Sequence, residues 1–184
     1  MSDILIGGVE KREIVIADYD PLWPEMFRRH AAIITHALGA TVLRLEHVGS
    51  TSVPGLAAKP IIDLDVLVED SSNEAAYLPA LVAAGYILRV REPGWHEHRM
   101  FRTAQRDVHV HVFSAGCVEF DRNLAFRDWL RLHPDDRLRY EALKRRLAKA
   151  EWPDMNAYAE AKSEVVEEIL ARALAGSSAS AERK

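Results

Sequence analysis

Two different periods of hydrophobic residues divide the chain. Up to residue 113, most apolar residues come in short stretches or alternate with polar ones, which is typical of β-strands, and two helical patterns interrupt them. Closer to the C-terminus they recur every three to four positions, which predicts helices. The predicted strands cover residues 13–16, 41–47, 61–68, 86–90, 99–103 and 108–113. The pattern therefore predicts a sheet followed by a helical region.

The first long helix is predicted to begin at Asp20 and to end before Gly39. Asp caps the free N–H groups of a helix start, Pro21 fits a first turn, and Gly is typical of a helix end. The apolar stripe of this helix consists of Trp23, Phe27, Ile34 and Leu38. We expect Trp23 to lie in the core because it begins the stripe.

A shorter helix is predicted at residues 74–84, and three more follow near the C-terminus. The first of these three covers residues 122–132. Aspartates are expected to cap or begin each of the three, and a proline ends the first. In chain order these signals are Asp121, Pro134, Asp135 and Asp154.

The order of the elements predicts an α+β fold, in which a mixed sheet has flanking helices and a C-terminal helical bundle closes a cleft. We expect residues 1–12 to be an N-terminal extension and residues 13–175 to form one domain. The small, polar residues 176–184 are expected to be a disordered tail.

Charge and composition narrow the classes of partner. The formal net charge is −4, so no global basic field favours binding to long nucleic acid. The single cysteine, Cys117, excludes an intrachain disulfide and fits a reducing compartment. Neither a signal peptide nor a membrane-spanning stretch is evident, so we expect a cytoplasmic protein without a membrane partner. The oligomeric state stays open.

Asp63 and Asp65 stand two residues apart in the apolar stretch 61–68. Side chains at positions i and i+2 of a strand point to the same face. Two neighbouring carboxylates in a buried sheet repel each other unless a cation neutralises them. The pair therefore predicts a site for a hard cation such as Mg²⁺, or for a bound basic group.

Gly49 and Ser50 follow the strand predicted at residues 41–47. Glycine lets the backbone approach a phosphate, and a serine hydroxyl with free N–H groups can bind phosphate oxygens. Thr51 follows in the same turn, and Lys59 stands four residues before Asp63. Lys59 is interpreted either as a solvated loop lysine or as a phosphate contact.

A Gly-Ser pair followed by an Asp-x-Asp strand resembles the signature of nucleotidyltransferases of the DNA polymerase beta type. The longer stretch His-Val-Gly-Ser-Thr-Ser-Val-Pro-Gly-Leu-Ala-Ala-Lys-Pro-Ile-Ile-Asp-Leu, at residues 47–64, looks like the hallmark of the GrpB family. Further matching motifs are Tyr19-Asp20-Pro21-x-Trp23, Val108-His-Val-His-Val112, Phe126-Arg127-Asp128-x-Leu130, Tyr140-x-x-x-Lys144 and Tyr158-x-x-x-Lys162. The resemblance covers residues 13–173. It implies the nucleotidyltransferase-like fold, and the family's domain is also found fused to dephospho-CoA kinases.

The strand 108–113 departs from the superfamily pattern. The superfamily commonly takes a third carboxylate from a later strand, whereas this strand offers His109 and His111 on one face. Three interpretations stay open: a histidine completes the metal site, the site has two aspartates only, or catalysis has been lost. Histidine ligands would shift the preference from Mg²⁺ toward Mn²⁺ or Zn²⁺. Exposed structural histidines are the alternative. His96 and His98, on a Pro-Gly loop, are interpreted as an exposed polar hairpin tip.

The resemblance implies a metal-dependent nucleotidyltransferase that uses a nucleoside triphosphate and Mg²⁺ or Mn²⁺, with Zn²⁺ as a further option. The alternative is a non-catalytic module that binds a nucleotide or coenzyme. The expected catalytic residues are Asp63, Asp65 and His111, and the expected metal ligands are Asp63, Asp65, His109 and His111. The expected phosphate- or nucleotide-binding residues are Gly49, Ser50, Thr51, Lys59, Arg127, Tyr158 and Lys162. The two Tyr-x-x-x-Lys pairs are interpreted either as amphipathic helix edges or as a surface for a base and a phosphate.

Overall fold

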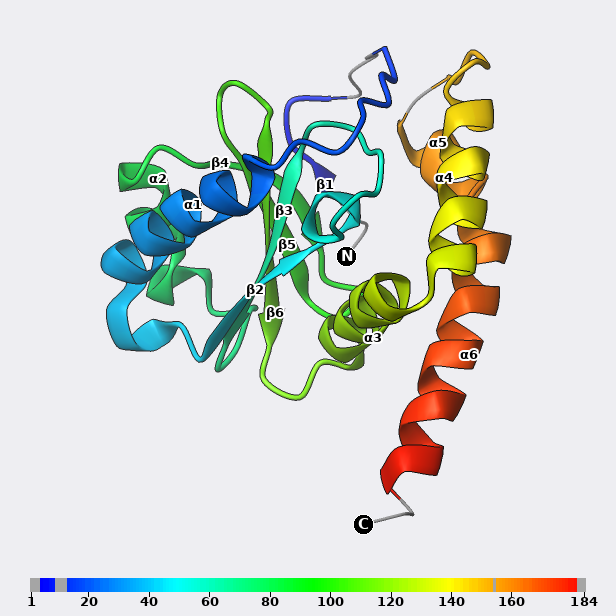
Figure 1. Cartoon of the computed structure of the whole chain (residues 1–184). Coiled ribbons are helices and arrows are strands. Elements are labelled where there is room, and N and C mark those ends of the chain that lie inside the picture. The colour runs from blue at the N-terminus through cyan, green and yellow to red at the C-terminus, as the bar shows by residue number, and fades with distance from the viewer. Residues whose placement is uncertain (1–3, 9–12, 154, 182–184) are drawn as a thin grey trace.

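A six-stranded mixed sheet forms the centre of the molecule (Figure 1). The computed structural model describes residues 4–8, 13–153 and 155–181. In chain order the strands are β1 (Ile4–Leu5), β2 (Arg44–Val48), β3 (Ile62–Val68), β4 (Ile87–Glu92), β5 (His98–Arg102) and β6 (Val108–Ser114). Their spatial order is β1-β4-β5-β6-β3-β2, and only the β3–β6 pair is parallel.

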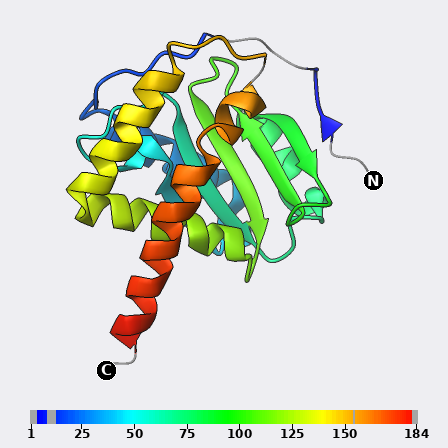
Figure 2. The ribbon, with the colours of Figure 1, turned by 90° about the vertical axis from the view of Figure 1, so that its right-hand side faces the viewer.

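Helices cover both faces of this sheet. The α-helices are α1 (Trp23–Leu38), α2 (Leu78–Ala83), α3 (Val118–Leu132), α4 (Pro134–Leu147), α5 (Met155–Glu160) and α6 (Ser163–Ala181). Helices α1 and α2 lie on one face, and the four C-terminal helices lie on the other (Figures 1 and 2). The predicted α+β class, with its mixed sheet, flanking helices and C-terminal helices, is confirmed. None of the described helices is both long and apolar enough to cross a bilayer.

The main core lies between the sheet and helices α1 and α2. The even-numbered residues of β3 and β6 point into it, and each contributes roughly 1.5–3 kcal/mol by burial. These side chains are Ile62, Leu64, Val66, Val108, Val110 and Val112, all fully buried. Trp23, Ile34 and Leu38 of α1 belong to the same core, which confirms the position predicted for Trp23. The odd-numbered residues of both strands consequently face the C-terminal helices.

A smaller cluster attaches the C-terminal helices to the loop after β2. Val53 and Leu56 of this loop are fully buried against Leu130 of α3, Tyr140 of α4 and Ile169 of α6. Three helices thus meet one loop, and that loop contains the Gly-Ser turn. Packing at this cluster therefore sets the position of the turn relative to the helices.

Residues 13–16 do not form the strand predicted for them. Only Ala17 pairs, in an isolated bridge with Ala58 made of two backbone hydrogen bonds of 2.9 Å. Ile14 and Ile16 are half-buried, whereas Val15 is 53% exposed. Alternation alone cannot distinguish such a segment from a paired strand, because both bury every second side chain.

The predicted helix starts need two corrections. Helix α1 begins at Trp23 rather than Asp20, with Pro24 instead of Pro21 in its first turn, although Asp20 accepts a hydrogen bond of 2.8 Å from the N–H of Leu22. Helix α3 begins at Val118, so Asp121 lies in its first turn and does not cap it. Aspartate is favourable both as a cap and within the first turn, so its presence does not give the boundary.

The segment 74–84 is also divided. It forms a 3₁₀ turn, η3 (Glu74–Ala76), and then α2, because Pro79 has no N–H to continue a helix begun at Glu74.

The last predicted helix is likewise two helices, α5 and α6, and Asp154, its expected cap, lies outside the described residues. Helix α6 continues past Gly176 to Ala181, into the segment expected to be a tail.

Arg127 joins α3 to the sheet. Its guanidinium donates to Glu46 at 2.8 Å, to the carbonyl of His47 at 3.0 Å and to Asp128 at 2.8 Å. The residue is only 8% exposed, so these bonds are largely screened from water. Arg127 therefore holds the strand that leads into the Gly-Ser turn.

We expect Arg127→Met to lower the free energy of unfolding by about 2–3 kcal/mol, because Glu46 and the His47 carbonyl lose their donor. Chemical denaturation measures this loss. Arg139→Met is the matched control, since the Arg139–Glu168 pair is nearly half exposed and exposed pairs contribute about 0–1 kcal/mol. Equal losses in the two variants would contradict the structural role of Arg127.

Candidate functional site

The parallel pairing of β3 and β6 brings the sequence-predicted acids and histidines together. In this register Asp63 lies beside His109, and Asp65 lies beside His111. All four side chains point to the face covered by the C-terminal helices, because they occupy odd positions in both strands.

Asp63, His109 and His111 form a cluster that can hold a metal ion. Their candidate ligand atoms lie within 4.8 Å of one another. Asp63 Oδ1 is 3.4 Å from His109 Nδ1 and 3.6 Å from His111 Nε2. Ligands about 2.0–2.1 Å from a tetrahedral ion lie about 3.3 Å apart. The donor set and its spacing thus fit a divalent cation that accepts imidazole, such as Zn²⁺ or Mn²⁺.

Electrostatics within the cluster favour an ionised carboxylate. Burial alone would raise the pKa of Asp63, but hydrogen bonds and charge from His109 and His111 outweigh it and hold that pKa below its usual range. Burial would lower the pKa of His111, yet the neighbouring Asp63 and Asp65 raise it overall. Asp63 can therefore supply a negatively charged oxygen as a metal ligand.

Asp65 lies outside this cluster. It is fully buried, and Asn123 of α3 donates to its Oδ2 at 2.8 Å. Among the described residues, none donates to its Oδ1. Burial is the main cause that raises the pKa of Asp65 to about 6. The two aspartates share one strand face, but the structure brings only Asp63 together with the histidines.

Gly49 allows the backbone to pass directly beside Asp63. Its φ is +67°, and a Cβ at this position would lie 2.5 Å from Asp63 Oδ2. Any other residue would combine a strained backbone with a clash against the carboxylate. Gly49, which was predicted to let the backbone approach a phosphate, therefore also leaves room for the carboxylate of Asp63.

Ser50 and Thr51 begin a short 3₁₀ turn, η2 (Ser50–Ser52), instead of a long helix. The Ser50 hydroxyl accepts a hydrogen bond of 2.9 Å from Lys144 Nζ. The Thr51 hydroxyl donates to the carbonyl of Ile61 at 3.1 Å and contacts His47 Nε2 at 3.1 Å. Ser50 thus faces the C-terminal helices, whereas Thr51 ties the turn to the start of β3.

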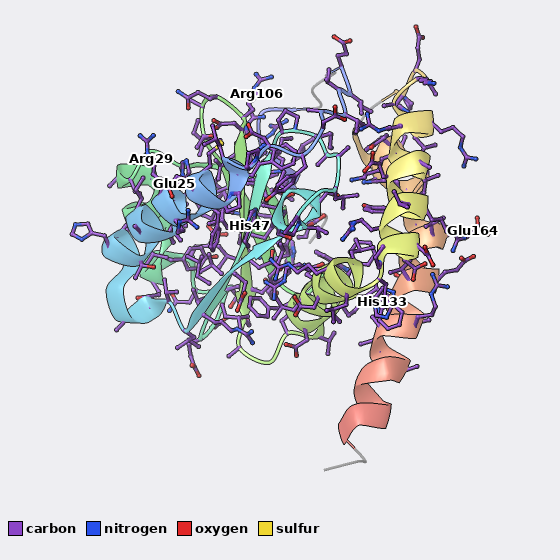
Figure 3. The ribbon with its side chains drawn as sticks, viewed as in Figure 1. Glu25, Arg29, His47, Arg106, His133 and Glu164 are labelled. Atoms are coloured by element: carbon purple, nitrogen blue, oxygen red, sulfur yellow. The ribbon has the colours of Figure 1, made fainter. Side chains whose placement is uncertain are left out.

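His47 supports the turn from the other side. Its ring stacks on Phe27 of α1, with centroids 4.7 Å apart. Burial lowers the pKa of His47 to about 4, so the ring is neutral. In Figure 3 it lies in the interior, while Glu25 and Arg29 of α1 point outward. His47 is a packed neighbour of Thr51 and lies outside the Asp63 cluster.

A cavity of about 200 Å³ is lined by the Gly-Ser turn, by helices α4 and α5 and by Lys162, which lies just before α6. Its lining includes Asp63 and His109 as well as three lysines. The lining residues are Ile16, Gly49, Ser50, Thr51, Ala58, Lys59, Ile61, Asp63, His109, Tyr140, Lys144, Tyr158 and Lys162. The space therefore combines a place for a cation with cationic groups suited to an anion.

Two of the lysines adjoin the buried ring of Tyr158. The ammonium groups of Lys59 and Lys162 lie 5.1 and 4.6 Å from its centroid, within cation–π range. Burial lowers the pKa of Lys162, while Asp63 raises it in part. Tyr158 is 1% exposed, so its ring supports ammonium groups and is not open for stacking with a nucleobase.

Lys144 is the third lysine, and it was not among the predicted site residues. It is 3% exposed, donates to Ser50 and to the carbonyl of Ala57, and lies 4.7 Å from the ring centroid of Tyr140. Burial is the main cause that lowers the pKa of Lys144 to about 7. The repeated Tyr-x-x-x-Lys spacing contained the signal, but only the second copy entered the prediction.

Two further residues differ from their expected positions. Arg127 does not line the cavity; its guanidinium is occupied by Glu46, Asp128 and the backbone of β2. His98 is not on an exposed hairpin tip but lies in β5, 5% exposed, with its Nε2 2.9 Å from His111 Nδ1. Burial keeps the pKa of His98 below its ordinary value.

Comparison with known proteins agrees with the family resemblance. The family model described as GrpB protein matches residues 13–172. A UPF0157 protein of Streptomyces coelicolor is 54% identical over 92% of this chain and 89% of its own length. A UPF0157 protein of Halalkalibacterium halodurans is 49% identical over 94% of this chain and 90% of its own length.

A solved structure and a longer relative extend this comparison. The crystal structure of the conserved protein GrpB from Enterococcus faecalis superposes with a TM-score of 0.79, at 34% identity, over 88% of this chain and 98% of that one. A dephospho-CoA kinase of Mycolicibacterium paratuberculosis is 32% identical to this chain. The match covers 78% of this chain and 42% of the kinase.

The lowered pKa of Lys144 predicts a pH-dependent anion site. Sulfate keeps its charge between pH 6 and 9, so a change in its affinity reports on the protein. We expect sulfate affinity, measured by titration calorimetry, to fall about tenfold as the pH rises past about 7, because Lys144 loses its positive charge. Lys144→Met should bind weakly and vary less with pH, whereas the exposed-site control Lys149→Met should behave like wild type. Identical pH profiles for wild type and Lys144→Met would contradict the prediction.

Proposed function

The chain belongs to the GrpB family, and from this premise we propose that it is a metal-dependent nucleotidyltransferase. It would transfer a nucleotidyl group from a nucleoside triphosphate to a hydroxyl or amine of a small molecule or protein. The observation that carries the proposal is that one cavity is lined both by Asp63 and His109, which form a candidate metal cluster with His111, and by three lysines, Lys59, Lys144 and Lys162.

Each residue of the cavity would have a separate role in nucleotidyl transfer. The three lysines neutralise the phosphates, and Gly49 leaves the backbone free to approach them. The acceptor oxygen or nitrogen attacks the α-phosphorus, the bond from that phosphorus to pyrophosphate breaks, and the acceptor's proton passes to His109. His109 is suited to this role because it lines the cavity and is a quarter exposed. His111 does not line the cavity, which favours a role as a ligand.

Asp63, His109 and His111 are the residues that would hold the divalent ion. When bound, such an ion supplies neutralisation of the negative charge on the transferring phosphate. One carboxylate with two imidazoles is a softer set than Mg²⁺ prefers, so we propose Mn²⁺ or Zn²⁺ ahead of Mg²⁺. In the transfer step the ion would be held by Asp63 and His111, because a metal-bound His109 nitrogen has no lone pair with which to accept the proton.

The size of the cavity limits what it encloses. Sites for whole drug-sized ligands occupy about 300–1,000 Å³, whereas this cavity has about 200 Å³. We propose that the phosphates bind inside and that the nucleoside remains at the mouth. Tyr158 then holds lysines in place rather than stacking on the base.

The alternative function is a non-catalytic nucleotide- or coenzyme-binding module. The observation that favours it is the position of Asp65, which is buried against Asn123 and leaves one carboxylate in the cluster. The relative named dephospho-CoA kinase adds an association with a longer protein of that name. Under this alternative the lysines would bind phosphates without turnover.

Pyrophosphate release separates the two functions. We expect wild type with Mn²⁺ to release pyrophosphate from at least one nucleoside triphosphate across a panel of hydroxyl and amine acceptors. Asp63→Asn should release it about 100-fold more slowly or not at all, because it loses the charged oxygen donor. Asp70→Asn, the same change at an exposed aspartate, is the control. Nucleotide binding without release would support the binding module, and no binding would overturn both functions.

Nucleotide affinity tests the lysines. A charge-assisted contact contributes roughly 1.5–3 kcal/mol, so Lys59→Ala and Lys162→Ala should each weaken binding of a nucleoside triphosphate about tenfold or more. Titration calorimetry on folded variants measures this, with the exposed Lys149→Ala as control. A double variant that binds as tightly as wild type would remove both lysines from the phosphate site.

A further inference from the structure

A line of hydrogen-bonding side chains runs away from the metal cluster behind His111. His111 Nδ1 lies 2.9 Å from His98 Nε2, and His98 Nδ1 lies 2.6 Å from Glu92 Oε2. The other ring nitrogen of His111, Nε2, faces Asp63 Oδ1 at 3.6 Å. Four residues from strands β3, β4, β5 and β6 are thereby connected in the order Glu92, His98, His111, Asp63.

Packing fixes the two imidazole rings of this line. The rings of His98 and His111 stack with centroids 5.2 Å apart and planes at 18°. Phe113 lies on His98 as well, with centroids 4.9 Å apart and planes at 26°. The His98 side chain is 6% exposed, so water does not readily replace its partners. Neither His98 nor Glu92 lines the cavity.

The hydrogen bonds permit one consistent assignment of protons when both rings are neutral. An ionised carboxylate only accepts, so His98 must carry its proton on Nδ1, facing Glu92. The Nε2 atom of His98 then has a lone pair and accepts from the Nδ1 proton of His111. His111 is left with its lone pair on Nε2, directed at Asp63.

That lone pair faces a carboxylate oxygen, which is also electron-rich. Two such atoms 3.6 Å apart repel each other unless a proton or a metal cation lies between them. Metal-bound histidines generally donate their second N–H to a partner that fixes ring orientation and tautomer. His98 occupies the position of that partner, and Glu92 determines the tautomer of His98.

Resting on the proposed metal-dependent function, we propose that Glu92 and His98 are positioning residues that hold His111 in its Nδ1–H form, so that His111 Nε2 binds a divalent cation together with Asp63. They act through His111 and touch neither nucleotide nor acceptor. In the sequence the signal was an acidic residue and a histidine six positions apart, Glu92 and His98, which face each other across the turn between β4 and β5. Only the pairing of β5 with β6 connects them to the cluster.

The first test is metal affinity, measured by titrating Zn²⁺ and Mn²⁺ into the full chain. His98→Phe keeps a stacked ring but removes both nitrogens, and we expect it to bind about 10–100-fold more weakly. Glu92→Gln, at a side chain 30% exposed, should lose less, because its amide can either accept from or donate to His98. His36→Phe, at an exposed histidine of α1, should match wild type. Circular dichroism and thermal unfolding confirm that each variant is folded.

The second test reads the tautomers directly by two-bond ¹H–¹⁵N NMR of the histidine rings, without metal and with Zn²⁺. We expect His98 to be the Nδ1–H tautomer in both states, and His111 to become the Nδ1–H tautomer with its Nε2 shifted on Zn²⁺ binding. An Nε2–H tautomer of His98 would overturn the proposal even if His98→Phe does not fold.

The outcomes separate this inference from the proposed function. Wild-type metal binding with an unchanged affinity in folded His98→Phe would overturn the positioning role alone. Absence of metal binding in wild type would overturn the positioning role and the metal-dependent function together. Loss of affinity in His98→Phe, with His36→Phe unchanged, supports the inference whether or not pyrophosphate is released.

Discussion

The parallel pairing of β3 with β6 is the constraint on which the rest of the structure depends. It aligns two strands with the same alternation, so that their even positions form one apolar surface. Their odd positions place two aspartates and two histidines on the other surface, which becomes apolar further along at Leu67 and Phe113. The apolar surface binds α1 and α2 through the main core. The other surface places Asp63 beside His109 and Asp65 beside His111. A shift of one residue in β6 would turn the histidines toward α1 and its valines toward the cavity, and a shift in β3 would bury the aspartates in the same way.

The C-terminal helices convert this polar strand face into an enclosed site. Alone, the strands would expose Asp63 and the histidines to water, where their attraction for a cation or for phosphate charge is strongly screened. Packing of α3, α4 and α6 against the loop after β2 brings Lys144 and Lys162 to the same cavity as Asp63. Enclosure strengthens every charge interaction within it, and also makes each unpaired charge costly.

That cost explains how the surroundings of the site are built. Asp65 is buried and receives a hydrogen bond from Asn123, and Lys144 is buried but donates to Ser50 and to a backbone carbonyl. The guanidinium of Arg127 donates hydrogen bonds to Glu46 and to the backbone carbonyl of His47 near the end of β2. These buried charged groups are thus held by partners within the protein, and through them they shape the turn and the strand end. Removing one member of such a pair would leave the other buried and unpaired, which is strongly destabilising.

The sequence by itself determined the α+β class, five of the six strands and the residue types of the cluster, because alternation and helical spacing are local properties. It also placed Asp63 and Asp65 on one face of a strand, and His109 and His111 on one face of a later strand. Only the tertiary structure decided which of these residues meet: strand pairing joined Asp63 to the histidines and left Asp65 to Asn123, and β5 brought His98 behind His111. Helix packing likewise placed Lys144 in the lining of the cavity and Arg127 against strand β2. These contacts join residues that are far apart in the chain, and a local sequence pattern carries no information about which distant residues meet.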